Sequence, residues 1–165
     1  MPRPVIRPLL LGLAALGISA ALYSRAQAGG EHYFPPVQDK TTLAECGSCH
    51  LAYPAAMLPA ASWKKMMANL DPHFGDNASL DPQTTAAITR YLVDHAGDTG
   101  GSAYGRKLLR GVAAGDAPQR ITTLPKWVKE HREVPKSDWA RKEVGTKANC
   151  AACHQDAERG YFEED

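Results

Sequence analysis

The chain has 165 residues, and its 19 Lys and Arg residues nearly balance 18 Asp and Glu residues, for a formal net charge of +1. This balance lacks the excess of positive charge that nucleic-acid binding requires, so we expect no nucleic-acid partner. The length suits one ordinary domain or two very small ones.

Residues 1–28 have the pattern of a secretory signal peptide. Arg3 and Arg7 precede an apolar run, which gives way to the small-residue sequence AQA at Ala26 to Ala28. The run is shorter than the roughly twenty residues that cross a bilayer. We therefore predict cleavage after Ala28, a periplasmic location, and no stable membrane insertion of the mature chain. An uncleaved leader that anchors the protein is the minor alternative.

All four cysteines of the chain belong to two copies of one five-residue pattern, CGSCH and CAACH. In an exported chain, paired cysteines most often form disulfides, but disulfides do not explain the histidine that closes each copy. Cys-x-x-Cys-His is the attachment signature of c-type haem, in which both thiols add to the vinyl groups and the histidine binds the iron. The sequence therefore predicts two covalent haem c groups, attached by Cys46, Cys49, Cys150 and Cys153, with His50 and His154 as iron ligands.

Two other uses of paired cysteines fit the sequence less well. A zinc ribbon keeps its two pairs about fifteen to twenty residues apart, far closer than Cys49 and Cys150. A thioredoxin-like redox pair needs a strand-rich context, and no segment alternates between apolar and polar residues as a strand would.

The segment after the first motif predicts two amphipathic helices. The first, in ASWKKMMANL, has Ser62 available as an N-cap and an apolar face formed by Trp63, Met66, Met67 and Leu70. The second, in LDPQTTAAITRYLVDHAG, has Asp81 as N-cap, Pro82 in its first turn and Gly97 as terminator. Its apolar face is formed by Ile88, Tyr91, Leu92 and His95.

The stretch GDTGGS, residues 97–102, is the most flexible-looking segment of the mature chain. We take it as the boundary between two small haem-binding domains, residues 29–98 and 99–165, each with one motif. The predicted fold class is all-α. Each haem supplies an apolar centre that a domain of this size cannot build alone.

The second predicted domain contains one further amphipathic helix, in TTLPKWVKEHREVP. Thr123 is its expected cap, Pro125 lies in its first turn, and Pro135 ends the segment. One face of this helix carries Leu124, Trp127, Val128 and His131. A short helix closed at Gly160 is predicted over the second motif. Residues 101–142 are rich in Lys and Arg, which predicts either a solvated face or a docking patch for an acidic partner.

The opposite ligand of each iron decides the chemistry of the haem, because methionine raises its potential and an open position admits small ligands. Residues 99–165 contain no methionine and only one histidine besides His154, namely His131. We predict His131 as the ligand of the second haem, the alternative being a core histidine. For the first haem His73, in a loop, ranks before His95, at the end of a helix, and His32, near the mature terminus. Met66 and Met67 are expected in the core.

The chain resembles the bacterial dihaem cytochromes c. The resemblance rests on CGSCHLAYPAAMLPAASWKKMMANLDPHFGDNASLDP, LPKWVKEHREVP and ANCAACHQDAERGYF, which cover most of residues 36–162. It implies bis-histidine ligation, with His73 and His131 at the distal positions. It also implies an N-terminal domain like the small helical, class I cytochromes c and a less regular C-terminal domain. The partners it implies are a small soluble haem protein, such as an oxygen-binding monohaem cytochrome, and a quinol-linked membrane cytochrome.

Three functions follow from these alternatives. A chain with two six-coordinate haems has no site for a substrate, so it would carry single electrons and would not be an enzyme. A dihaem peroxidase or a small-ligand reductase would need one open haem with polar distal groups. A haem-based redox or gas sensor, which sheds a ligand on reduction, is the third.

Overall fold

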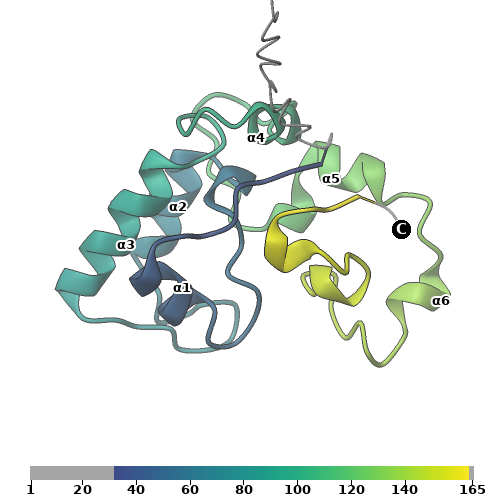
Figure 1. The fold of residues 1–165 in the computed structure, drawn as a ribbon, viewed down its shortest axis with the longest axis horizontal. Helices are drawn as coiled ribbons and strands as arrows, with labels where there is room; N and C mark the ends of the chain where they lie inside the picture. The colour runs from purple at the N-terminus through teal and green to yellow at the C-terminus, as the bar shows by residue number, and fades with distance from the viewer. Residues whose placement is uncertain (1–31, 164–165) are drawn as a thin grey trace, which may run out of the picture.

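The computed structural model describes residues 32–163. Within this range the chain is mostly helical, and it forms no strand beyond two isolated β-bridges. The α-helices are α1 Lys40–Cys46, α2 Ala60–Met67, α3 Pro82–Asp94, α4 Ala103–Leu108, α5 Pro125–Glu130 and α6 Lys136–Trp139 (Figure 1). Four 3₁₀ turns complete the order: η1 Ala55–Met57, η2 Ile121–Thr123, η3 Cys150–Ala152 and η4 Ala157–Arg159. None of the helices in this range is long and apolar enough to span a bilayer.

Helix α2 buries three of the four residues predicted for its apolar face, and the fourth, Leu70, lies beyond its end and is partly buried. Trp63, Met66 and Met67 are buried, and the Trp63 Nε1 donates a hydrogen bond of 2.8 Å to the Ala55 carbonyl. The predicted cap is wrong, because α2 begins after Pro59 and Ser62 lies buried inside its first turn. An X-Pro dipeptide is already extended, so Pro59 starts the helix without a side-chain cap.

Helix α3 begins as its sequence predicts. The Asp81 carboxylate accepts hydrogen bonds from the backbone N–H groups of Gln83 and Thr84, and Pro82 occupies the first position. Ile88 and Leu92 are fully buried against α2.

The predicted boundary segment is attached to the N-terminal half of the chain. The Gly97 N–H donates to the Leu58 carbonyl at 3.0 Å, and a Cβ on Gly97 would lie only 2.4 Å from the Ala56 oxygen. Gly105, in α4, comes equally near the Ala56 oxygen, because a Cβ there would lie 2.7 Å away. Helix α4 therefore crosses η1 closely, and glycine is required where the backbones meet. The division at residues 97–102 stays a prediction.

The C-terminal half departs from the helices that its sequence predicts. Helix α5 begins at Pro125 with Leu124 as its N-cap, so the expected Thr123 cap is wrong. Val128 is 50% exposed, although it was predicted on the buried face. The predicted helix over the second motif is replaced by the 3₁₀ turns η3 and η4, and Gly160 closes η4 with φ of 87°.

A single buried cluster runs through both halves of the molecule. Phe34, from the N-terminal segment, contacts the rings of Tyr104 and Phe162 at centroid distances of 4.8 and 5.6 Å. The Phe34 N–H also donates to the Gly160 carbonyl at 2.8 Å. The first described residues thus lie beside the C-terminal turns, as Figure 1 shows, and connect the two halves of the molecule.

Candidate functional site

The first motif begins where α1 ends. The Asp39 carboxylate caps the helix by accepting from the Thr42 N–H, and these hydrogen bonds lower the pKa of Asp39. At the other end the Gly47 N–H donates to the Leu43 carbonyl, and a Cβ on Gly47 would lie 2.4 Å from that oxygen. The motif residues after Cys46 form a turn and bends and do not continue the helix.

The His50 imidazole is oriented by its neighbours on both sides. Its Nδ1 donates to the Leu51 carbonyl at 2.8 Å, which leaves Nε2 free to bind a metal. One contact of the ring is a stack on Tyr53 with centroids 4.9 Å apart. The other is with His73, at a centroid distance of 6.2 Å and an interplanar angle of 20°.

His73 reaches this position from the loop between α2 and α3. The Phe74 N–H donates to the Pro72 carbonyl at 2.7 Å, which closes a three-residue turn around His73. Burial lowers the pKa of His73, as does the neighbouring His50, whereas Asp76 raises it. The pKa of His73 is lowered overall, which favours the neutral imidazole, the form that binds a metal.

The second motif forms one compact turn. Both the Cys153 and the His154 N–H groups donate to the Cys150 carbonyl, at 3.2 and 2.9 Å. The two cysteines and the histidine therefore follow one another around a single turn. The His154 Nδ1 donates to the Glu163 carbonyl at 3.2 Å.

His131 faces His154 from the end of α5. Its Nδ1 donates to the Trp127 carbonyl at 2.9 Å, and its ring stacks on the Trp127 indole with centroids 4.0 Å apart. Trp139 packs at 6.2 Å on the same imidazole. The centroids of His131 and His154 lie 6.1 Å apart, with ring planes at 78°.

The other candidates for iron ligation lie elsewhere. His95 is exposed, stacks on Tyr91 at a centroid distance of 4.4 Å, and donates from Nδ1 to the Tyr91 carbonyl. The prediction that His95 lies on the buried apolar face is therefore wrong. His32 stacks on Tyr104 at 4.9 Å. Met66 and Met67 are buried in the core, as expected.

The thiols and imidazoles fit two haem groups. All four cysteines are free, and in each motif the first is half-buried while the second is exposed. Burial raises the pKa of Cys46, and raises that of Cys150 to about 11, so both thiols are neutral in this state. Two imidazoles that bind one metal from opposite sides, each at about 2 Å, have ring centroids about 6 Å apart. Both histidine pairs have this spacing.

Two aromatic side chains that contact the paired histidines were not predicted from the sequence. Tyr53 stacks on His50 and donates from its hydroxyl to the Ala148 carbonyl at 2.7 Å. Burial, with a smaller effect of Cys150, raises the pKa of Tyr53 to about 12, so the hydroxyl stays a donor. Trp139, the second, lies in α6, for which the sequence predicted no element. An aromatic residue three positions after CGSCH is the signal that could have identified Tyr53.

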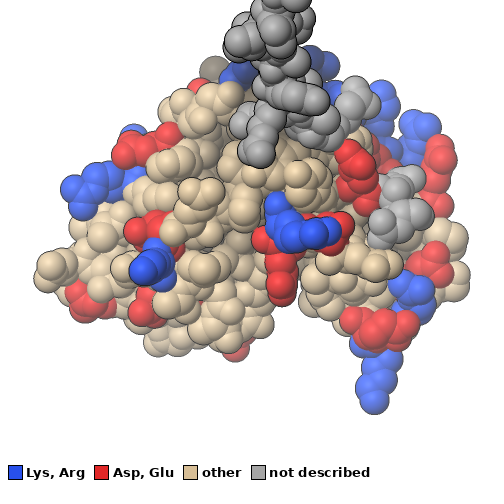
Figure 2. All heavy atoms as spheres, in the orientation of Figure 1, with Lys and Arg blue, Asp and Glu red and all other residues tan. Residues whose placement is uncertain are grey.

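Charge on the surface is mixed. Lys126 pairs with Glu130, Arg132 with Glu133 at 3.0 Å, and Arg141 with Glu143 at 3.6 Å. Figure 2 shows blue and red side chains interspersed over the face in view. These observations favour a solvated face over a docking patch of one sign.

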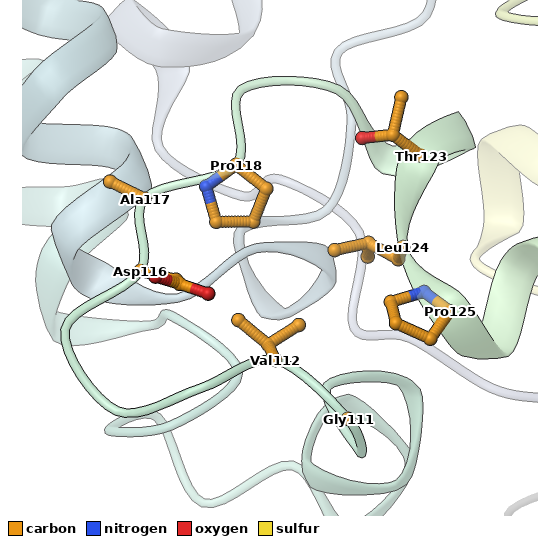
Figure 3. A pocket seen from close by; sticks show the side chains of 8 residues that line it. All are labelled: Gly111, Val112, Asp116, Ala117, Pro118, Thr123, Leu124 and Pro125. Atoms are coloured by element: carbon orange, nitrogen blue, oxygen red, sulfur yellow. The ribbon is translucent and has the colours of Figure 1, made fainter.

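A shallow pocket of about 370 Å³ lies away from both motifs. Figure 3 shows its lining from the loop after α4 and from the start of α5: Gly111, Val112, Asp116, Ala117, Pro118, Thr123, Leu124 and Pro125. Because the lining includes none of the motif residues or paired histidines, we do not assign the pocket to the haem sites.

Comparisons with known proteins identify the family of the chain. Residues 42–162 match the family model of dihaem cytochrome c. A dihaem cytochrome c structure from Rhodobacter sphaeroides is 46% identical, covers 78% of this chain and 99% of its own, and superposes with a TM-score of 0.70. One from Shewanella baltica OS155 is 42% identical, covers 77% of this chain and 89% of its own, and has a TM-score of 0.63. No curated protein matches the chain.

Proposed function

The chain belongs to the dihaem cytochrome c family, which binds two covalent haem groups and works by haem-based electron transfer, and on this premise we propose a bis-histidine, low-spin electron carrier. Haem iron supplies a one-electron couple between its ferric and ferrous states. One observation supports the proposal most directly: His73 faces His50, and His131 faces His154. The ring centroids of these pairs lie 6.2 and 6.1 Å apart.

Each protein group has one task in this proposal. The four motif thiols would attach the two haem groups, and His50 and His154 would bind the irons. His73 and His131 would supply the second nitrogen ligand of each iron. Two nitrogen ligands on each iron would leave no open position for peroxide or another substrate, which favours a carrier over an enzyme.

The two sites also touch each other through protein groups. Tyr53 stacks on His50, and its hydroxyl donates to the carbonyl of Ala148, which lies two residues before Cys150 in the chain. This chain of contacts places the first iron ligand close to the second attachment motif. Such proximity supports rapid electron exchange between the two sites.

Carbon monoxide added to the reduced holoprotein tests the proposal. We expect an unchanged absorption spectrum, since neither iron has a free position. The oxidised protein should show only low-spin signals in paramagnetic resonance, and both haems should titrate below the range of methionine-ligated cytochromes c. A spectral shift with carbon monoxide in the wild-type protein would overturn bis-histidine closure and favour the reductase or sensor alternatives.

We also propose the location and the partners that the sequence predicts. The leader at residues 1–28 lies outside the described residues, and mass spectrometry of the purified protein should find a mature chain that starts at Gly29. A small soluble oxygen-binding monohaem cytochrome is the proposed acceptor and a quinol-linked membrane cytochrome the proposed donor. Stopped-flow mixing with the oxidised acceptor should show second-order oxidation of this protein.

A further inference from the structure

The two distal histidines are held in different ways. His131 ends a helix, donates to the Trp127 carbonyl and packs on two tryptophan rings. His73 lies in a loop, and within residues 32–163 its ring makes no hydrogen bond. The position of His73 therefore depends on the conformation of its loop.

This loop is strained directly after His73. Phe74 has φ of 54°, a conformation that no other non-glycine residue in the described range adopts, and Gly75 follows with φ of 118°. The Phe74 ring is 47% exposed, so burial does not explain the conformation. A strained backbone persists only where surrounding contacts hold it.

Arg120 supplies such a contact. Its guanidinium carbon lies 4.1 Å from the centroid of the Phe74 ring, within the range of a cation–π interaction. The Phe74 ring also contacts the His73 imidazole, and the centroids of these two rings lie 4.9 Å apart. Arg120 comes from the segment before η2, far from the loop in sequence, and no ion pair occupies it within the described residues.

We propose that Arg120, acting through Phe74, is a positioning residue that holds His73 against the first iron, and that loss of this contact opens a binding site there for small exogenous ligands such as cyanide. The proposal rests on the proposed bis-histidine ligation. It assigns no equivalent opening to the second haem, because His131 both stacks on the Trp127 indole and donates a hydrogen bond to the Trp127 carbonyl.

The size of the effect follows from the strength of the contact. The apparent affinity for an incoming ligand equals its intrinsic affinity multiplied by the fraction of molecules with His73 displaced. An exposed cation–π contact changes such an equilibrium by about twofold to fivefold. Arg120→Ala should therefore raise the cyanide affinity of the oxidised holoprotein at the first haem about twofold to fivefold.

A cyanide titration of the ferric holoprotein, followed by absorption and paramagnetic resonance, tests this expectation. The cyanide signal should match that of a His73→Ala variant, in which the first position is fully open. Phe74→Leu should raise the affinity at least as much as Arg120→Ala does, because it also removes the ring that contacts His73. The double variant should bind no tighter than Phe74→Leu alone. Arg120→Lys should fall between wild type and Arg120→Ala, since a lysine retains the cation without the planar fork.

The matched control is Arg110→Ala, an exposed arginine for which the described structure shows no ring contact. It should leave the cyanide affinity at the wild-type value. Equal affinity in Arg120→Ala and wild type would overturn the proposal, and so would a double variant whose effect is the product of the single effects. These outcomes are separate from failure of the proposed function, which a high-spin or carbon monoxide-binding wild-type protein would show.

Discussion

Removal of the His131 imidazole should open one haem and leave the other closed. In the structure His131 is the only imidazole whose ring contacts His154 in the described residues, and the neighbouring indoles of Trp127 and Trp139 have no nitrogen lone pair for a metal. In His131→Ala one of the two predicted ligand pairs is lost, so half of the total haem should become high-spin. The variant loses two tryptophan contacts, at about 0.5–1.5 kcal/mol each, and one hydrogen bond worth about 1 kcal/mol. This sum is below a typical stability of about 5–15 kcal/mol, so the variant should stay folded.

Paramagnetic resonance of the oxidised variant and carbon monoxide titration of the reduced variant measure the opened fraction. We expect one carbon monoxide bound per protein molecule. The control is His95→Ala, because His95 is exposed and stacks on Tyr91 away from both pairs, and this variant should stay low-spin and bind none. A His131→Ala protein that remains fully low-spin would refute the assignment of the second haem's ligand and show that another side chain reaches the iron.

Three further predictions follow from the structure. Changing both cysteines of CAACH to alanine should leave one covalent haem by mass spectrometry; two haem masses would contradict the reading of the motif. Gly160→Ala places a Cβ 2.0 Å from a backbone oxygen at φ of 87°, and should lower the free energy of unfolding, measured with denaturant, by at least about 2 kcal/mol. Gly115→Ala, at φ of 89° with open space around it, should lower the free energy of unfolding by less. Hydrogen bonds from Thr84 lower the pKa of the Asp81 carboxyl below 3.8. The ionised carboxylate therefore stabilises the folded protein above that pH, and this stabilisation is lost as the pH falls through the pKa of Asp81 in the folded state. Asp81→Asn keeps a cap that does not titrate, so it should lose less stability than wild type on acidification below pH 3.8; an equal loss would contradict this.

Local signals in the sequence predicted the helices that depend on local chemistry. Asp81 and Pro82 define the start of α3 as expected, because a carboxylate cap and a fixed φ act within one turn. Ser62 and Thr123 have equally good capping chemistry and do not cap, since Pro59 and Pro125 start their helices one or more residues away. Where two start signals compete, the sequence alone does not rank them.

The side chains of α5 show a second limit of sequence reasoning. Periodicity put Val128 beside Trp127 on the buried face, yet Val128 is half-exposed. A helix as short as Pro125–Glu130 has room for only one buried row of residues, and the elements packed against it decide which row that is. The contact between Phe74 and Arg120 is likewise invisible in the sequence, because no local pattern connects residues so far apart.

The sequence by itself determined the covalent chemistry of this protein. Two Cys-x-x-Cys-His motifs, with no cysteine elsewhere, specify two haem attachments wherever the chain folds, because both thiols and the following imidazole lie within five residues. Only the tertiary structure decided which imidazole faces the first motif. His73 and His95 were open alternatives in sequence, and packing of α2 against α3 brings the loop between these helices, not the end of α3, to His50. Metal ligation acts over about 2 Å, and distances on that scale between remote residues are set by the packing of the whole core.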